Sequence, residues 1–495
     1  MASNTSQPKF SIKLMVHKVE KRVIFAEVHS DFVDTLFSIM TLPIATIVRL
    51  LRKRHGEKLK RIGSLNNLYQ SLLDLPMNCL SSKENKWMLL NPRTSSHDLC
   101  RKLTVNINDQ EPTKYFICQD FNCILRLFST TYASTCNLAI CSHCGKMMNR
   151  EVKYEDLTVK DDSDGGVFVY NLTTFIVTDD LRVIPNSPGS SIQLLCELGI
   201  TDVSCLDNIS FNIGVDQIFN LLEGALASKN PLTCMVFPGS HYIQGLGVSR
   251  GEPLVKNLTK VTTANSSSTL KLKVTMQKST AKFLFAEGDY DFVEFVFGFL
   301  EIPLGTVIGK LLNGASIFLS LNNLFSSISS LGVGDYIKSN ELKNMLLEPH
   351  LVQKNVSVNQ IFPVTAVSSL SGVYSSYCHS YLKQGTFFAS LTRSKMSKNY
   401  EREEFHDIRF KDSRINGRYL NAPAKFMLTD DLVITPLSSF SSITTLGKLK
   451  VPLNDIEVHE LSIGIDEGVE ILDASLRSFE VFTESILKRI IKVKN

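Results

Sequence analysis

The sequence predicts a mixed α+β fold made of two tandem homologous units of β-hairpins and short helices, the first with a zinc-ribbon-like cysteine insert. Three observations support this class. A set of motifs occurs twice in the same order, alternating hydrophobic runs are interspersed with helical patterns, and closely spaced cysteines occur in the first half alone. The composition agrees, because 43% hydrophobic and 21% charged residues are typical of globular chains. With 53 basic and 49 acidic residues, the charge gives no general indication of a nucleic-acid or membrane partner.

Two copies of one unit account for most of the chain. The matching segments are 22–51 with 281–312, 64–72 with 320–328, 88–92 with 345–349, and 175–185 with 426–436. Their common order predicts repeat unit 1 at 10–228, with its cysteine-rich insert at about 115–150, and repeat unit 2 at 269–490 without such an insert. Residues 229–268 are rich in Pro, Gly, Ser and Asn, which predicts a linker.

Each unit is expected to begin with a β-hairpin followed by helices. In the first unit the runs IKLMVHK and RVIFAEV alternate in polarity and are joined at VEKR. Asp31 precedes a helical pattern and is expected to cap it, and Pro43 is expected to start a second helix. The apolar face of the first helix is expected to comprise Phe32, Leu36, Ile39 and Met40.

The later elements of the unit follow the same logic. Ser64 is expected to cap a third helix that carries a leucine stripe in SLNNLYQSL. The run FIVTDDLRVIP predicts a strand, a tight turn and a second strand. After it, SSIQLLCEL predicts a helix, ISFNI a strand and DQIFNLLEGAL the last helix.

The location of the protein is inferred from its apolar stretches and its cysteines. Residues 32–51 and 292–312 are rejected as membrane spans because each contains charged residues and a proline. The N-terminus lacks the apolar run of a secretory signal. An odd count of 11 cysteines without such a signal favours a reducing compartment. We therefore expect an intracellular protein, cytoplasmic or nuclear, without a transmembrane segment.

The cysteines of the first unit predict a structural zinc site. The predicted ligands are Cys118 and Cys123 in YFICQDFNC, and Cys141 and Cys144 in CSHCGK. Two cysteine pairs on tight turns, separated by a loop, are typical of a tetrahedral Zn²⁺ site, and Gly145 permits a turn conformation that a bulkier residue disfavours. Because four thiolates fill the tetrahedron, the zinc is expected to be structural and not catalytic.

Other interpretations of these cysteines stay open at the level of the sequence. Cys136 or His143 is an alternative ligand. A redox pair is a second alternative, although such a pair is expected at the start of a helix that follows a strand. Unligated buried thiols are a third. The second unit has a single cysteine, Cys378, and is expected to bind no metal.

No pattern of catalytic residues accompanies the repeat. The Asp179–Asp180 and Asp430–Asp431 pairs are expected to form polar hairpin turns, and Glu27 and Glu287 to face neighbouring helix N-termini. The sequence contains no nucleotide-binding or serine-hydrolase fingerprint. Duplication without a duplicated catalytic set favours a non-enzymatic scaffold or adaptor with a protein partner.

Two other functions stay open. One is an enzyme that uses a cleft between the units. The other is the binding of nucleic acid or another anion by the run RLLRKRHGEKLKR at 49–61, whose counterpart in the second unit has one lysine. The same run is also typical of a solvated helix end. Its basic residues are Arg49, Arg52, Lys53, Arg54, Lys58, Lys60 and Arg61.

A set of motifs resembles a known family. The motifs are Phe-Ala-Glu followed by Asp-Phe-Val-Asp, Leu-Pro-Ile-Ala-Thr, Leu-Asn-Asn-Leu, Met-Leu-Leu-x-Pro, Cys-x-x-Cys-Gly and Thr-Asp-Asp-Leu. Together they resemble the plant family known as domain of unknown function 674, and the resemblance covers both halves. It implies a plant intracellular protein with a two-copy layout and carries no assigned activity. The second half departs from the pattern because it lacks the cysteine block.

Overall fold

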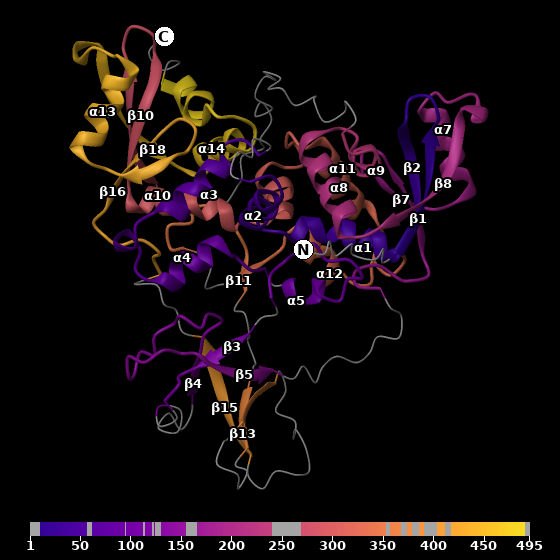
Figure 1. Cartoon of the computed structure of the whole chain (residues 1–495), viewed down its shortest axis with the longest axis horizontal. Helices are drawn as coiled ribbons and strands as arrows, with labels where there is room; N and C mark the ends of the chain where they lie inside the picture. Colours follow the sequence, from indigo (N-terminus) through magenta and orange to yellow (C-terminus); the bar gives the residue numbers. More distant parts are fainter. Residues whose placement is uncertain are drawn as a thin grey trace, which may run out of the picture.

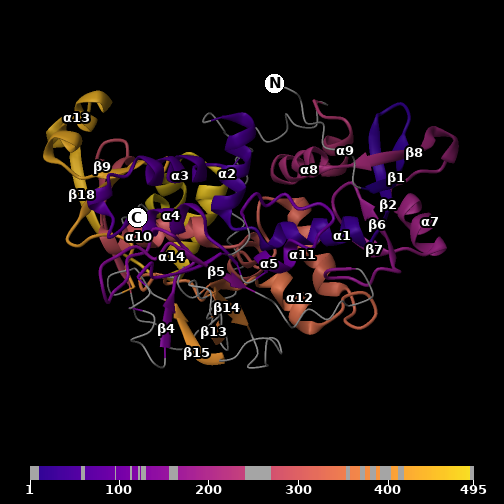
Figure 2. The ribbon, with the colours of Figure 1, turned by 60° about the horizontal axis from the view of Figure 1, so that its bottom comes forward.

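The structure is a computed structural model with a mixed α/β architecture of several sheets and helices. It describes residues 10–56, 62–94, 96–111, 114–120, 123, 130–154, 166–239, 269–352, 357–367, 374–378, 386–390, 403–410 and 417–490. Figures 1 and 2 show these elements from two directions.

Two five-stranded antiparallel sheets form the framework, and their strands follow equivalent orders. The first has the order β7-β6-β2-β1-β8, from β1 (Phe10–His17), β2 (Arg22–His29), β6 (Thr174–Thr178), β7 (Val183–Pro185) and β8 (Leu206–Ile213). The second has the order β17-β16-β10-β9-β18, from β9 (Leu270–Gln277), β10 (Lys282–Asp289), β16 (Lys425–Leu428), β17 (Ile434–Pro436) and β18 (Ile456–Ile463). The predicted first hairpin and the strand–turn–strand around Thr-Asp-Asp are confirmed in both sheets.

The described helices pack on these sheets or on one another. They are α1 (Ser30–Ser38), α2 (Ile44–His55), α3 (Leu65–Asp74), α4 (Lys83–Leu90), α5 (His97–Cys100), α7 (Pro188–Glu197), α8 (Val215–Ala227), α9 (Pro231–Val236), α10 (Tyr290–Gly298), α11 (Leu319–Ser330), α12 (Asn340–Leu347), α13 (Ser439–Leu449) and α14 (Ile465–Arg477). Residues Thr306–Leu311 form a π-helical segment at the position that α2 takes in the first half.

Two predicted helix caps are wrong. Helix α1 begins at Ser30, one residue before Asp31, and has no side-chain cap. The Asp31 carboxylate instead accepts a hydrogen bond from the Thr104 hydroxyl at 2.8 Å. Ser64 precedes α3 without capping it, because its hydroxyl donates at 2.6 Å to the backbone oxygen of Ser478, in the other half of the chain. Local sequence cannot reveal such a competing long-range acceptor.

The two halves of the chain cross each other at Pro43 and Pro303. These prolines form an isolated antiparallel bridge. The Ile44 N–H donates to the Ile302 oxygen at 3.1 Å, and the Leu304 N–H donates to the Leu42 oxygen at 2.9 Å. The crossing is therefore reciprocal, with equivalent residues of the two halves bonded to each other.

Beyond the crossing, each half supplies helices to the sheet of the other half. Asn67 on α3 donates its side-chain N–H to the Asp431 backbone oxygen at 2.9 Å, at the turn of the second sheet. Asn323 on α11 makes the equivalent bond to the Asp180 oxygen at 2.9 Å, at the turn of the first sheet. Both figures show α3 and α4 on the side of α10 and α14, and α11 and α12 on the side of α1 and α8.

The packed bodies consequently combine segments from both predicted units. The ranges 10–228 and 269–490 remain a prediction about sequence relationship, whereas each sheet packs with a helix from the other range. The range 229–268, predicted as a linker, begins with helix α9, whose residues Leu232 and Met235 are buried in the core. The rest of that range, from 240 to 268, lies outside the described residues.

A third, small sheet is shared by the two halves. Its strands are β3 (Tyr115–Ile117), β4 (Thr130–Ala133) and β5 (Arg150–Tyr154) from the first half, and β13 (Tyr374–Cys378), β14 (Thr386–Ser390) and β15 (Glu403–Phe410) from the second. The order β3-β5-β14-β13-β15-β4 closes on itself, because Phe116 and Ser134 exchange both backbone hydrogen bonds at 2.8 Å. The predicted insert is therefore part of a joint structure and not a separate ribbon. Figure 1 shows this sheet below the two large bodies.

One apolar core runs through both large bodies. Phe32 and Phe37 of the first half belong to the same buried cluster as Phe292 and Phe297 of the second, and each is at most 1% exposed. The predicted face of the first helix is confirmed, since Leu36, Ile39 and Met40 are fully buried. Among the described helices, none combines the length and apolarity needed to cross a bilayer. A separate two-stranded parallel pair, β11 (Leu351–Val352) with β12 (Ala366–Val367), completes the described strands.

Candidate metal centre

The shared sheet positions four cysteines at one end. Cys118 directly follows strand β3, and Cys123 follows a few residues later. Cys141 and Cys144 lie in the connection between β4 and β5. Because β3 pairs with β5 and is bridged to the end of β4, the segment after β3 and the connection between β4 and β5 meet at the same end of the sheet.

The four sulfur atoms form a compact cluster. All lie within 4.8 Å of one another, and the Sγ atoms of Cys118 and Cys144 are 3.4 Å apart. A disulfide would require about 2.05 Å, so these thiols are unbonded. A Zn–S distance of about 2.3 Å would place tetrahedral sulfurs about 3.8 Å apart, which matches the scale of this cluster.

A tight hairpin aims Cys141 and Cys144 into the cluster. The Cys141 N–H donates to the Lys146 oxygen at 2.8 Å, and the Gly145 N–H donates to the Cys141 oxygen at 2.9 Å. Gly145 has a φ of 71°, in the left-handed region that side chains disfavour. The glycine that follows the second cysteine is thus required by the turn.

Backbone N–H groups and one ion pair stabilise the two turns. The Asp120 N–H points at Cys118 Sγ at 3.4 Å, and the Lys146 N–H bonds to the Cys144 sulfur, which lowers the pKa of that thiol to about 7. Burial raises the pKa of the Cys118 thiol. The Lys146 ammonium lies 2.8 Å from the Asp120 carboxylate and joins the two turns. N–H groups directed at sulfur are the expected surroundings of metal-bound thiolates.

The alternative ligands lie outside the cluster. Cys136 is buried and burial raises its pKa to about 11, but it is not part of the four-cysteine group. The side chain of His143 is exposed. Cys141 and Cys144 lie in a hairpin and not at the start of a helix, so the context of a redox pair is missing at this position. The side chain of Cys378 lies outside the described residues.

The paired aspartates at the sheet turns, Asp179–Asp180 and Asp430–Asp431, form hydrogen bonds that stabilise the fold. Asp179 accepts hydrogen bonds from the N–H and hydroxyl of Thr233 at 2.8 and 2.7 Å, at the start of α9. Asp430 makes the equivalent bonds to Thr483, at 2.9 and 2.5 Å. Burial raises the pKa of both carboxyls. The carboxylate of the second aspartate in each pair accepts a hydrogen bond from the asparagine of a helix in the other half: Asn67 bonds to Asp431, and Asn323 bonds to Asp180.

Two other acids differ from their predicted roles or were not predicted. Glu27 does not face a helix N-terminus, because it pairs with Lys13 on the adjacent strand at 3.4 Å and is 42% exposed. Asp34 is 2% exposed and accepts the backbone N–H groups of Phe168 and Val169 at 2.9 and 3.0 Å. The sequence feature that could have indicated this structural role of Asp34 is the position of a carboxylate within the apolar face of a helix.

The described arginines of the basic run are held by internal partners. These bonds are Arg49 Nη2 to Asp109 Oδ1 at 2.8 Å, Arg52 Nη1 to Asn66 Oδ1 at 2.7 Å, and Arg54 Nη2 to Asn220 Oδ1 at 2.6 Å. Lys53 is exposed, and Lys58, Lys60 and Arg61 lie outside the described residues. The structure therefore uses these arginines to hold α2 in place, which reduces their availability to a polyanion.

The fold and the cluster together define a mixed α/β protein with a four-cysteine site of the kind that can hold a metal ion. The chain belongs to the family described as protein of unknown function (DUF674), whose model matches residues 6–466. The family resemblance of the sequence motifs is thereby confirmed. Comparisons with curated proteins and with solved structures give no match.

Proposed function

We propose that the protein is a non-enzymatic scaffold of two homologous units, and that Cys118, Cys123, Cys141 and Cys144 hold one structural Zn²⁺. The observation that supports the metal is the convergence of four thiols within 4.8 Å. Thiolate ligands favour soft or borderline ions, and a single ion fits this spacing better than a polynuclear iron–sulfur cluster. With four sulfurs around the ion, no position is open for a substrate or water.

The metal would replace a hydrophobic core that this end of the sheet lacks. Besides the cysteines, the local buried cluster contains only Ala139 and Met148 among the described residues. So little apolar surface gives weak stabilisation, which is the situation in which small folds use metal ions. Zinc would join the turn after β3 to the hairpin between β4 and β5 and so order the shared sheet.

Several features support the scaffold of two units. The two large sheets have equivalent strand orders, and the exchanged asparagines make equivalent contacts. The duplicated aspartates are engaged in folding contacts, as are Asp34 and its counterpart Glu294, which accepts the backbone N–H of Tyr419. A protein partner in the cytoplasm or nucleus is the proposed context of this scaffold.

Metal analysis of the full-length protein tests the zinc site. We expect about one zinc per chain and no iron. Cys141→Ser should lose the metal, and the matched control Cys136→Ser should retain it, because Cys136 is outside the cluster. Protein loaded with cobalt should show the sulfur-to-metal absorption of a tetrathiolate site, which does not depend on stability measurements. Metal-free purified protein, or equal metal loss in both variants, would contradict the proposal.

A further inference from the structure

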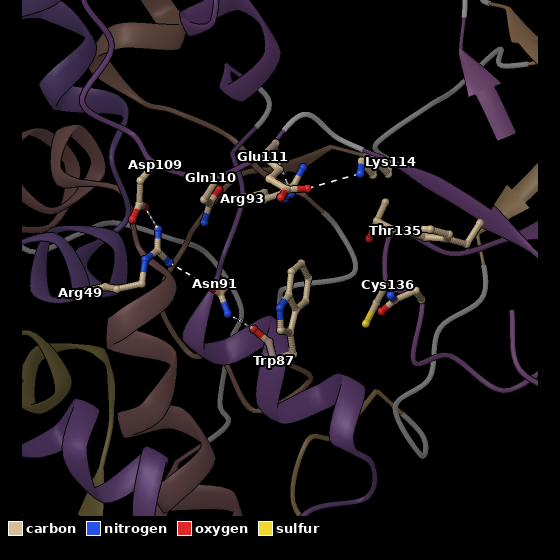
Figure 3. Close-up of a pocket in the computed structure, with 12 residues that line it drawn as sticks. Arg49, Trp87, Asn91, Arg93, Asp109, Gln110, Glu111, Lys114, Thr135 and Cys136 are labelled. Atoms are coloured by element: carbon tan, nitrogen blue, oxygen red, sulfur yellow. Dashed lines mark hydrogen bonds and ion pairs between the residues drawn. The ribbon is translucent and has the colours of Figure 1, made fainter. Parts of the chain in front are cut away.

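A cavity of about 400 Å³ lies between the helices and the shared sheet, away from the cysteine cluster. Its volume is within the range of small-molecule sites. The residues that line it include Arg49, Trp87, Arg93, Asp109, Glu111 and Lys114. Figure 3 shows the lining residues as sticks, with the ring of Trp87 standing among polar side chains.

The aromatic wall of this cavity is provided by the only tryptophan of the sequence. Trp87 lies on α4 and is partly exposed, and Phe116 on β3 lines the cavity with it. No described residue accepts a hydrogen bond from the indole N–H. A flat apolar surface with a free donor at its edge suits a ring-shaped ligand that carries polar groups.

The polar groups around the tryptophan are held in place by one another. Arg49 donates to Asp109 Oδ1 and to Asn91 Oδ1, both at 2.8 Å. Asn91 in turn donates to the backbone oxygen of Trp87 at 3.1 Å. On the other side, the Lys114 ammonium lies 3.4 Å from the Glu111 carboxylate. The Arg49–Asp109–Asn91 group is held on both sides in this way and loses little freedom when a ligand binds, whereas the Lys114–Glu111 pair is exposed.

The charges of the cavity are largely balanced, with three cations and two carboxylates in its lining. Arg49 is paired with Asp109 and Lys114 with Glu111, so an anionic ligand would have to compete with a carboxylate for these two cations. The third cation, Arg93, donates to the backbone oxygen of Glu111 at 3.2 Å. What the cavity offers is donors and acceptors side by side. A hydroxyl group both donates and accepts, so several adjacent hydroxyls match this lining best.

We propose that this cavity binds a neutral saccharide of one or two rings, with the C–H face of a sugar ring on Trp87 and its hydroxyls on the Arg49–Asp109 pair. The acids of the cavity are ion-paired and the Cys136 thiol is protonated at neutral pH, because burial raises its pKa to about 11. The proposal is therefore one of binding alone.

Trp87 supplies the assay, because all tryptophan fluorescence of the full chain comes from this cavity. The probes are D-glucose, D-galactose, D-xylose, sucrose and maltose, with glucose 6-phosphate and adenosine monophosphate as anionic comparators. We expect a saturable change in emission with at least one neutral sugar. Asp109→Asn should weaken that binding about tenfold or more, because the ligand hydroxyls lose a charged acceptor. Asp74→Asn, a surface carboxylate outside the cavity, should leave it unchanged.

A second measurement keeps the test independent of the fluorophore and of folding. Calorimetric titration of Trp87→Phe should show weaker binding of the same sugar, while circular dichroism shows unchanged secondary structure. The proposal is overturned if no neutral sugar on the panel gives a saturable change. It is equally overturned if a phosphorylated comparator binds as tightly as the best neutral sugar, since the cavity would then be an anion site.

Discussion

The reciprocal exchange of helices predicts that the two large bodies unfold together and that each exchanged asparagine stabilises both of them. Asn323→Ala removes two hydrogen bonds to Asp180, one to its backbone oxygen at 2.9 Å and one to its carboxylate at 3.1 Å. Asn67→Ala removes the equivalent bonds to Asp431, at 2.9 and 3.2 Å.

The magnitude follows from the exposure of the acceptors. A neutral hydrogen bond contributes about 1 kcal/mol and one to a charged group about 1.5–3 kcal/mol, so the two together would give about 2.5–4 kcal/mol. The Asp180 side chain is 40% exposed, so water can replace the lost donor at the carboxylate. We therefore expect each variant to lower the free energy of unfolding by about 2 kcal/mol. The exposed Asn208→Ala is the matched control and should change it by about 0.5 kcal/mol or less.

Urea unfolding followed by far-ultraviolet circular dichroism and by Trp87 fluorescence measures both effects. Helix α3 belongs to the first half by sequence and packs on the second sheet, so unfolding of either body removes a helix from the other. The two probes should report one coincident transition, and each asparagine variant should shift it as a whole. Two resolved transitions, or variants no less stable than Asn208→Ala, would refute the reasoning.

Two further predictions concern single buried positions. Burial raises the pKa of Asp34 to about 6, so between about pH 4 and pH 6 the native state binds more protons than the unfolded state. The free energy of unfolding should therefore fall as the pH rises through this window, and Asp34 should contribute up to about 3 kcal/mol of that fall. Asp34→Asn should remove this contribution and leave the part that comes from other buried carboxyls such as Asp179 and Asp430, whereas Glu27→Gln should leave the slope unchanged. Urea midpoints at several pH values check this, and a slope in Asp34→Asn equal to that of the unsubstituted protein would contradict it. Gly63 has a φ of 47°, and a Cβ there would clash with the backbone oxygen of Ser475. Gly63→Ala should therefore lower the melting temperature by several degrees. The control Gly189→Ala, whose Cβ would meet no neighbour, should not lower it. Equal effects of the two variants in thermal unfolding would show that the backbone of Ser475 does not lie close to Gly63.

Much of the local structure was predictable because short-range physics determines it. Alternating polarity in IKLMVHK and RVIFAEV leaves one buried face only in an extended conformation, and β1 and β2 pair accordingly. The spacing of the four cysteines already required two tight turns, and the structure brings their sulfurs together. The predicted caps at Asp31 and Ser64 are wrong because their side chains bond to distant partners.

The cavity could not be predicted because its walls come from segments that lie far apart in the sequence. Arg49 was part of the basic run, whose sequence suggested a solvated helix end or an anion site. Its actual partner, Asp109, is 60 positions away in the chain. Trp87 belongs to no repeated pattern, and its single occurrence was the one available signal.

The sequence by itself predicted the first hairpin, the strand–turn–strand around Thr-Asp-Asp, the repetition of the motifs and the clustering of the cysteines, because each depends on propensity, periodicity or spacing within a short segment. Only the tertiary structure decided which sheet each SLNN helix packs on. The turns around Asp180 and Asp431 are nearly identical in sequence, so a helix bearing Leu-Asn-Asn-Leu fits either one with the same hydrogen bonds. Which sheet each helix packs on depends on the crossing at Pro43 and Pro303. Backbone hydrogen bonds at this crossing direct each half of the chain toward the sheet of the other half. When two turns have matching sequences, the sequence alone does not tell which of them a given helix contacts. The path of the chain in space decides this.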